Sequence, residues 1–192
     1  VVEPKIRSEG KKLEDVEEDL QVSNRTPEDL IVDGHNFIRR NIESELLEKI
    51  ANNSPDFFEK LVLKLIKEMG YGVDHSLLGR SGDGGVDGVI REDKLGLDEI
   101  YLQAKRWKNS VTVHQIRDFA GALQSKKSKK GIFITTSEFT GDANDFVKNI
   151  ENKIILINGE KLASLMYEYD IGVKTQDIYE IKKIEEDYFS DE

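Results

Sequence analysis

The chain has 192 residues, 38% of them hydrophobic and 34% charged, with a formal net charge of −10, a composition typical of a soluble globular domain with a heavily charged surface. No apolar run approaches the roughly 20 residues of a membrane-spanning helix and no secretory leader opens the chain, so we expect a cytoplasmic protein without a membrane partner. Cysteine is absent, which excludes disulfide bonds, zinc–thiolate sites and cysteine nucleophiles.

The N-terminal region, residues 1–50, is predicted to be an arm followed by a helix. Residues 1–25 mix charges with few apolar residues, which is typical of a linker. Thr26 and Pro27 form a helix-start signal, and the apolar residues of 37–50 recur every four positions, as on an amphipathic helix. Because the first residue is valine, we expect that an upstream domain is missing and that this region is its remnant or linker.

The main domain, residues 51–174, is predicted to open with a helix and three strands. Ser54 and Pro55 mark the start of an apolar-faced helix that runs to Met69 and stops at Gly70. Glu59 falls at the border of the apolar face of this helix and reads as an exposed first-turn acid. The strands are predicted at 71–78, 86–91 and 99–107.

The second half of this domain alternates helices and strands. Helices are predicted after the capping-box segment at Thr112, at 141–150 and at 159–169, and buried strands at 131–136 and 154–157. Helices and strands in this order predict an α/β fold, with a mixed central sheet that carries helices on both faces. Residues 175–192 are predicted to be an acidic C-terminal tail.

A possible hairpin in the middle of the chain is the most informative feature, because it gathers polar residues. Residues 82–90 are glycine-rich and residues 100–107 follow as a second extended run. If the two pair as a hairpin, the alternation of side chains puts Asp87, Gln103 and Lys105 on one face. The opposite face is then small or apolar, with Val86, Gly88, Ile90, Ile100, Leu102 and Ala104.

This combination suits the hydrolysis of a phosphodiester. That reaction needs a hard cation, positive charge near the phosphate and activation of water. Asp87 offers a carboxylate oxygen of the kind Mg²⁺ prefers, Gln103 offers a neutral oxygen, and Lys105 offers positive charge. The alternative interpretation is an ordinary cross-strand ion pair between Asp87 and Lys105.

The charge distribution is consistent with a nucleic-acid partner, although the net charge is negative. Each terminal region carries a net charge of −5, and residues 51–174 are neutral overall. A basic segment follows the hairpin and opposes only Asp118, which gives it a charge of +7. Such a segment indicates either phosphate contacts or a solvated turn. Its members are Lys105, Arg106, Lys108, Arg117, Lys126, Lys127, Lys129 and Lys130.

Several residues are open to two interpretations. Trp107 stacks on a base or sugar, or it anchors the end of its strand in the core. The hydroxyls of Thr135, Thr136 and Ser137 hold a phosphate, or they cap the following helix. His75 and His114 are weak candidates for catalytic bases.

Taken together, these motifs resemble the catalytic domain of the Mrr-type restriction endonucleases. The resemblance rests on Glu59 in a Phe-Phe-Glu-x-Leu-Val helix, on Gly82 to Gly88, on Gln103-Ala104-Lys105-Arg106-Trp107, and on the strand Gly131 to Ser137. It covers about residues 50 to 170. The family is a branch of the PD-(D/E)xK nucleases in which glutamine replaces the usual second acid, and Gln103 occupies that position here.

The resemblance implies a three-layer α/β/α restriction-endonuclease-like fold and Mg²⁺-dependent hydrolysis of double-stranded DNA, with Mn²⁺ as a substitute ion. It implies that Asp87, Gln103 and the Ala104 carbonyl bind the metal, that Lys105 activates water, and that Glu59 is a further acid of the site. Arg106, Lys108 and the lysines 126, 127, 129 and 130 are then the candidates for DNA contacts.

Other expectations concern the biological substrate. Family members often carry an N-terminal DNA-reading domain, and the family includes cutting of methylated DNA, but residues 1–50 contain no convincing reader. Cutting both strands usually takes two active sites, so we expect a homodimer on DNA. The alternatives are a repair or branched-DNA nuclease of the same fold, and a DNA-binding module that has lost catalysis.

Overall fold

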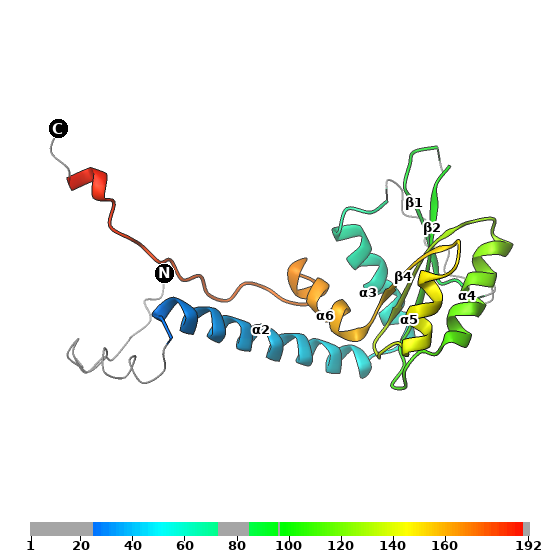
Figure 1. Ribbon diagram of the computed structural model, residues 1–192, viewed down its shortest axis with the longest axis horizontal. Coiled ribbons are helices and arrows are strands. Elements are labelled where there is room, and N and C mark those ends of the chain that lie inside the picture. The colour runs from blue at the N-terminus through cyan, green and yellow to red at the C-terminus, as the bar shows by residue number, and fades with distance from the viewer. Residues whose placement is uncertain (1–24, 73–84, 96, 190–192) are drawn as a thin grey trace.

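The computed structural model describes residues 25–72, 85–95 and 97–189. Figure 1 shows a sheet with helices on both sides, a long N-terminal helix that extends away from it, and an extended C-terminal segment. The helices are α2 (Pro27–Ala51), α3 (Pro55–Glu68), α4 (Val113–Ser125), α5 (Gly141–Lys148), α6 (Gly159–Glu168) and the 3₁₀ helix η1 (Glu186–Phe189). The strands are β1 (Gly88–Arg91), β2 (Glu99–Lys105), β3 (Lys130–Thr135) and β4 (Lys153–Ile157).

The sheet has the order β1-β2-β3-β4 and is mixed, as predicted. Strands β1 and β2 pair antiparallel, with Gly88 opposite Leu102. Strands β2, β3 and β4 are parallel, with Lys105 opposite Thr135 at their carboxyl ends. The predicted strand at 71–78 falls largely outside the described residues.

Two hydrophobic clusters separate the layers. One cluster joins α3, α6 and the end of α2 to one face of the sheet, through residues such as Phe58, Leu65 and Leu102. The other joins α4 and α5 to the opposite face, through Phe119, Leu123 and Phe133. This is the three-layer α/β/α arrangement predicted from the sequence, and it places β2 in the interior between helices.

The predicted helix-start signals are confirmed at three helices. Ser54 accepts a hydrogen bond from the Phe57 amide at the start of α3, and Thr112 forms a capping box with Gln115 at the start of α4. Thr26 forms another capping box at the start of α2. There the signals at Thr26 and at 37–50 belong to one continuous helix, because Gly34 lowers helix stability by only about 1 kcal/mol and does not interrupt it.

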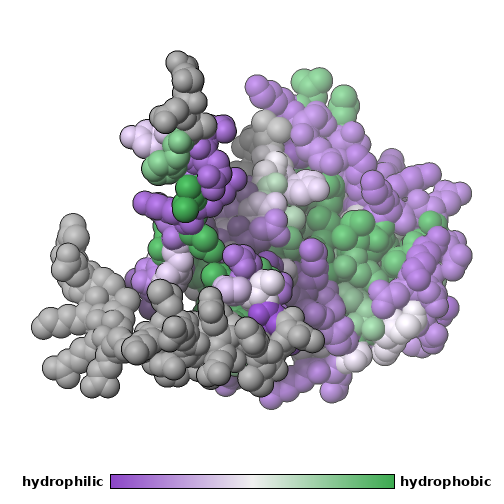
Figure 2. Space-filling view, turned by 60° about the vertical axis from the view of Figure 1, so that its left-hand side comes forward, coloured by the Kyte–Doolittle hydropathy of each residue, from purple (hydrophilic) through white to green (hydrophobic). Residues whose placement is uncertain are grey.

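The surface reflects the high content of charged residues. Figure 2 shows hydrophilic side chains over most of one face, with hydrophobic side chains gathered in smaller areas between them. Exposed large hydrophobic residues occur mainly on the first half of α2 and in the C-terminal segment, where Phe37 and Tyr179 are examples. Within the described residues, none of the helices has the length and apolar character needed to cross a membrane.

Candidate active site

Asp87 lies just before β1, at a point where the side-chain alternation is broken. Val86 packs in the cluster on the α4 side together with Val89, whereas Ile90 belongs to the α3 side. A Cβ on Gly88 would approach Leu63 of α3 at 3.1 Å, so Gly88 also faces α3. The prediction that Val86 shares a face with Gly88 and Ile90 was therefore wrong.

The break has a physical cause at the first residue pair of the strand. Side chains alternate from Val86 to Asp87, but Asp87 and Gly88 both face α3. The Asp87 amide donates to the Leu102 carbonyl at 2.8 Å, although Leu102 is the register partner of Gly88. Two residues therefore lie opposite one, as in a β-bulge, and this extra residue keeps the Asp87 side chain near α3.

The Asp87 carboxylate takes the place of a backbone partner for β2. Its Oδ2 accepts a hydrogen bond from the Ala104 amide at 2.8 Å. The same oxygen lies 4.0 Å from Nζ of Lys105, and both side chains are partly buried. The carboxylate and the ammonium predicted to work together are thus adjacent, held at the carboxyl end of β2.

Glu59 joins this pair from the first half of α3. It lines a small crevice with Asp87, Val62 and Ala104. Burial, followed by the neighbouring charge of Asp87, raises the pKa of Glu59, while Lys105 opposes the rise. The sequence pattern alone favoured an exposed first-turn acid at this position, and the structure instead places Glu59 beside Asp87.

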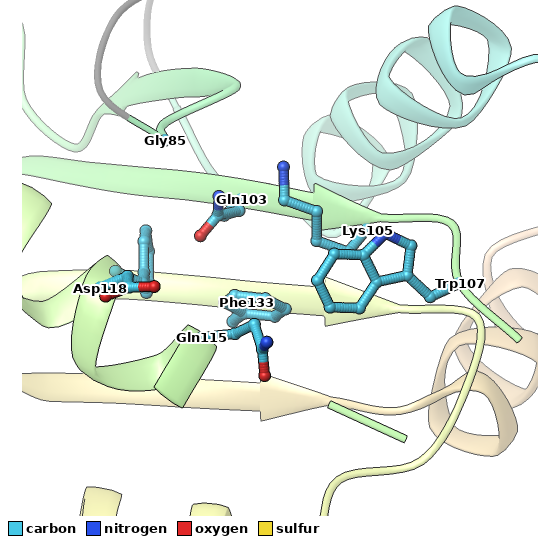
Figure 3. Close-up of a pocket in the computed structure, with 8 residues that line it drawn as sticks. Gly85, Gln103, Lys105, Trp107, Gln115, Asp118 and Phe133 are labelled. Carbon is cyan, nitrogen blue, oxygen red and sulfur yellow. The ribbon is translucent and has the colours of Figure 1, made fainter. Parts of the chain in front are cut away.

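Gln103 lies on the α4 side of the sheet and is 6% exposed. Its amide nitrogen approaches Gly85. Figure 3 shows Gln103 and Lys105 on β2, with Trp107 just beyond its end, around a cavity of about 350 Å³. Gln103 and Lys105 share a face, as the alternation predicted, but Asp87 lines the crevice on the α3 side, so the prediction that all three share one face was wrong. The other residues that line the cavity are Gly85, Gln115, Asp118, Phe119 and Phe133.

The donor set fits a hard divalent cation. In a strand, the N–H and C=O of one residue point to the same side, so the Ala104 carbonyl faces the side on which its N–H meets Asp87. A carboxylate, a backbone carbonyl and a second acid with a raised pKa place oxygen ligands and excess negative charge close together. Among the described residues no cluster holds three acidic, histidine or cysteine ligands, so any metal here relies on neutral oxygens as well.

Arg106 has a structural contact that the sequence did not predict. Its Nη1 donates to the Ala51 carbonyl at 2.6 Å, at the end of α2. This bond ties the residue after Lys105 to the long N-terminal helix. The positive charge also lies near the negative end of the dipole of α2, which is a favourable arrangement.

The hydroxyls at the end of β3 and just after it bond to backbone carbonyls. Thr135 donates to the Lys105 carbonyl at 2.8 Å, Thr136 to that of Trp107 at 2.9 Å, and Ser137 to that of Asn109 at 2.8 Å. The sequence had suggested that these hydroxyls hold a phosphate or cap the following helix, and it did not predict bonds to the carbonyls of the preceding loop. These hydroxyls hold the segment that follows Lys105.

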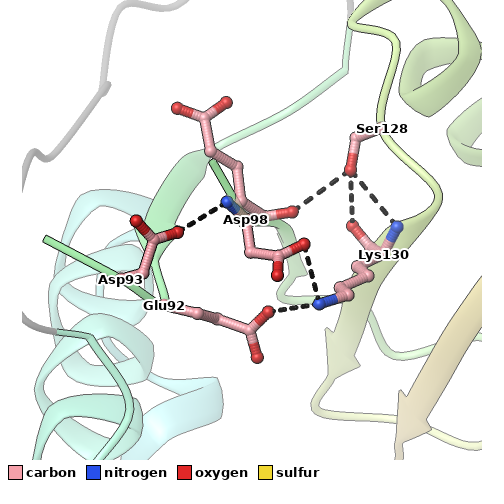
Figure 4. A network of polar contacts seen from close by, with 6 residues as sticks. Glu92, Asp93, Asp98, Ser128 and Lys130 are labelled. Atoms are coloured by element: carbon pink, nitrogen blue, oxygen red, sulfur yellow. Dashed lines mark hydrogen bonds and ion pairs between the residues drawn. The ribbon is translucent and has the colours of Figure 1, made fainter. Parts of the chain in front are cut away.

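The basic segment is divided between the two ends of the sheet. Lys108 follows β2 at the candidate site, but Lys130 begins β3 at the other end, about 17 Å away at roughly 3.3 Å per strand residue. Lys130 contacts Glu92 at 2.6 Å and Asp98 at 3.1 Å, in the network of Figure 4. Lys129 contacts Glu151. Lysines 126 to 130 therefore lie away from the described site, because α4 carries the chain back along the whole sheet, and their contact with DNA stays a prediction.

The histidines do not contribute to the described site. His114 is exposed in the first turn of α4 and His35 is exposed on α2. His75 lies outside the described residues, as do Gly82, Asp83 and Gly84 of the glycine-rich motif. Gln115 and Asp118 were not singled out from the sequence, although the capping box at Thr112 fixes α4 over this part of the sheet.

The fold and the gathered acids and lysine define a domain of the restriction-endonuclease class. A family model described as a restriction endonuclease, the Mrr catalytic domain, matches residues 50–166. The chain therefore belongs to the Mrr-type restriction endonucleases, a family of nucleases that hydrolyse DNA.

Individual relatives agree with this placement. The chain is 40% identical over 172 residues to the type IV methyl-directed restriction enzyme EcoKMrr of Escherichia coli (strain K12), covering 88% of this chain and 56% of that protein. Among solved structures, the DNA modification-dependent restriction endonuclease AspBHI aligns with a TM-score of 0.53 and 23% identity, over 69% of this chain and 36% of that one. It supports the fold.

A second solved structure is the MspJI restriction endonuclease in complex with a 27-mer oligonucleotide. It aligns with a TM-score of 0.52 and 25% identity, over 65% of this chain and 31% of that one. The chain thus spans about half the length of EcoKMrr and about a third of each of these two chains.

Proposed function

We propose that this chain is the catalytic part of a divalent-metal-dependent endonuclease that cuts double-stranded DNA. The observation that carries the proposal is the cluster of Glu59, Asp87 and Lys105 at the carboxyl end of β2. Asp87 is fixed by the Ala104 amide at 2.8 Å and lies 4.0 Å from Lys105. Membership of the restriction endonuclease family supports the same reaction class.

The metal ligands in this proposal are Asp87, the Ala104 carbonyl and Gln103, with Mg²⁺ as the ion and Mn²⁺ as its substitute. When bound, such an ion polarises the phosphate and favours hydroxide over water. Asp87 and Ala104 lie on one side of β2 and Gln103 on its α4 side, so Gln103 requires a side-chain rotation or a bridging water to reach the same ion.

The remaining residues act on charge and protons. Lys105 stabilises the negative charge that develops on the phosphate and orients the attacking water. Glu59, with its raised pKa, is suited to take up or hold a proton near the reacting phosphate. Lys105 and Asp87 can keep their present positions in both roles. Their charged atoms are 4.0 Å apart, which is an ion pair but not a short hydrogen bond.

The substrate is proposed to be DNA that carries methylated or otherwise modified bases. EcoKMrr is named as methyl-directed and AspBHI as modification-dependent. This chain covers only about half of EcoKMrr, so in our proposal the modification is read by protein outside residues 50–166, and this domain makes the cut. Two copies on one duplex cut both strands, and the protein acts in the cytoplasm.

The proposal is tested by incubating the protein with methylated and unmethylated plasmid DNA in the presence of Mg²⁺, Mn²⁺ or EDTA. We expect nicked and linear products with metal, none with EDTA, and none with a Lys105→Ala variant. Full cleavage by Lys105→Ala, or no cleavage under any metal condition, contradicts the proposal. Salt-sensitive binding without any product instead identifies a DNA-binding module, and a preference for four-way junctions identifies a branched-DNA nuclease.

A further inference from the structure

Trp107 is an exposed aromatic residue on a segment that is held firmly in place. The indole is 40% exposed and belongs to neither hydrophobic cluster. It is the only tryptophan of the chain. It therefore does not anchor the end of β2 in the core, which was one of the two interpretations of this residue.

The backbone around Trp107 is fixed at short intervals. The hydroxyl of Thr136 bonds to the Trp107 carbonyl, and those of Thr135 and Ser137 bond to the carbonyls two residues before and after it. Beyond Ser110, the chain is fixed again by the bridge between Val111 and Phe139. Three hydroxyl groups and a strand bridge thus hold a loop of about five residues, so the indole is presented on a rigid support.

Two cavities meet at Trp107. The first, of about 350 Å³, is the one that Gln103 and Lys105 line. The second, of about 440 Å³, is lined by Arg106, Lys108, Asn109 and Ser110. Trp107 and Gln115 line both, so the indole stands at the boundary between them, and Figure 3 shows it beside the Lys105 side chain.

The two cavities differ in chemistry. The first contains the amide groups of Gln103 and Gln115 in front of the buried rings of Phe119 and Phe133, and its one acid, Asp118, offsets the charge of its one cation, Lys105. This lining suits a flat base with hydrogen-bonding edges. The second contains two cations and no acid, which suits a phosphate. A nucleotide has both parts, and its base stacks favourably on an aromatic side chain.

We propose that Trp107 is the stacking platform of a nucleotide subsite next to the scissile phosphate. It takes one unstacked nucleotide of the strand that is cut, with its base against the indole in the first cavity and its following phosphate beside Lys108 in the second. A base can reach this position only when it has left the duplex stack, so the subsite favours single-stranded, frayed or distorted DNA. This inference deepens the proposed function, because it concerns the same active site.

Tryptophan fluorescence tests the subsite directly, because Trp107 is the only tryptophan of the chain and selective excitation separates its emission from that of the six tyrosines. The protein is titrated, in Ca²⁺ and without Mg²⁺, with a 20-residue oligothymidylate and with a strand of the same length that contains only abasic sites. Binding of each labelled strand is measured separately by anisotropy. We expect the oligothymidylate to quench the emission to saturation, and the abasic strand to bind without comparable quenching.

Two results overturn the stacking proposal: an oligothymidylate that binds without changing the emission, or equal quenching by both strands. Variants give a second measurement. Trp107→Ala is expected to weaken oligothymidylate binding about tenfold and Trp107→Phe about twofold. The matched control is Tyr179→Ala, which removes an aromatic ring that is 87% exposed in the C-terminal segment and should leave the affinity unchanged. An equal loss in the control, or none in Trp107→Ala, also refutes the subsite.

The binding test and the cleavage test have independent outcomes, so the failure of the subsite can be distinguished from the failure of the nuclease proposal. A protein that quenches with oligothymidylate but cuts no DNA refutes the nuclease proposal and supports the subsite. A protein that cuts plasmid DNA while Trp107 emission stays unchanged on oligothymidylate binding supports the nuclease proposal and refutes the subsite.

Discussion

The carboxylate of Asp87 accepts a hydrogen bond from the backbone amide of Ala104, with an N–O distance of 2.8 Å. The bond continues the β1–β2 ladder with a side chain where the backbone pairing ends. It therefore fixes the acid relative to the strand that carries Gln103 and Lys105. A carboxylate positioned by the backbone of its neighbouring strand is preorganised to bind a cation or a phosphate-bound water.

The first prediction separates the charge of Asp87 from its hydrogen bond. Asp87→Asn keeps an oxygen that can accept from the Ala104 amide but removes the negative charge, so metal-dependent cleavage should fall at least about 100-fold while Tm changes little. Plasmid cleavage and thermal denaturation measure the two effects. Asp145→Asn is the control, because the Asp145 side chain forms an exposed pair with Lys148 on α5, away from the candidate site.

Three other outcomes of the Asp87→Asn experiment would contradict this prediction or its control. Cleavage near the level of the wild-type protein would remove Asp87 from the metal site. A large fall in Tm would instead assign Asp87 a structural role, as in an ordinary cross-strand ion pair. Loss of cleavage in Asp145→Asn would show that the assay responds to surface charge in general.

The second prediction follows from the raised pKa of Glu59. Burial and Asp87 disfavour the ionised carboxylate in the folded protein. The cost is absent while Glu59 is protonated, below the ordinary glutamate pKa of about 4.3. It is complete once the pH has risen through the raised pKa of the folded state. Glu59→Gln carries no such cost, so its Tm should rise relative to the wild-type protein as the pH increases through this window.

This measurement is made in EDTA, because a bound cation would stabilise the ionised acid and mask the effect. Glu185→Gln, in the exposed C-terminal segment, is the matched control for the loss of one glutamate charge outside the α-helices. A Tm difference for Glu59→Gln that is independent of pH would contradict the buried environment of Glu59.

Most of the fold could be predicted from the sequence, because helix caps and apolar strand patterns depend on residues that are close together in the chain. Caps such as Ser54 and Thr112 mark helix starts through contacts three residues away, and buried strands such as β3 have a continuous apolar pattern. The bulge at the start of β1 could not be predicted, because Asp87 and Gly88 both lie opposite Leu102 and this reverses the alternation that was extrapolated through Val86. Glu59 and Asp87 line the same crevice although they are far apart in the sequence, so only the family resemblance suggested that they belong to one site.

The third prediction concerns the divided basic segment. If DNA lies over the carboxyl end of β2, Lys108→Ala should weaken DNA binding and reduce the magnitude of its salt slope by about 1, since one phosphate contact is lost. Lys130→Ala should leave the slope unchanged and lower Tm slightly, because Lys130 pairs with Glu92 and Asp98. Anisotropy at several salt concentrations measures both. A larger slope change for Lys130→Ala would place DNA at the opposite end of the sheet.

The fourth prediction tests the neutral ligand. Gln103→Glu adds a charge near Asp87, so if Gln103 reaches the ion, Mn²⁺ should bind at least about fivefold more tightly, because a unit charge at 4 Å contributes about 1 kcal/mol even at the dielectric constant of water. Calorimetric titration with Mn²⁺ measures this. Gln124→Glu, an exposed position at the end of α4, is the control. Unchanged affinity in Gln103→Glu would exclude Gln103 from the ligand set.

The fifth prediction concerns Thr135, which is fully buried and donates to the Lys105 carbonyl at 2.8 Å. Thr135→Val keeps the shape of the side chain and removes this bond, together with the bonds at 3.2 Å that link the Thr135 hydroxyl to the amide and the hydroxyl of Ser137. The carbonyl still accepts from the amides of Trp107 and Thr136, so it is not left without a partner, and the loss of stability should be only about 1 kcal/mol.

Cleavage should fall more than this stability loss explains, because Thr135 positions the backbone of Lys105 and the loop that carries Trp107. Thr135→Ser, which restores the hydroxyl, should recover cleavage even if its smaller side chain leaves the protein less stable than Thr135→Val. Single-turnover cleavage at saturating metal and thermal denaturation separate the two quantities. If cleavage followed stability across both variants, Thr135 would be a core residue only, and the hydroxyls after β3 would have no part in positioning the site.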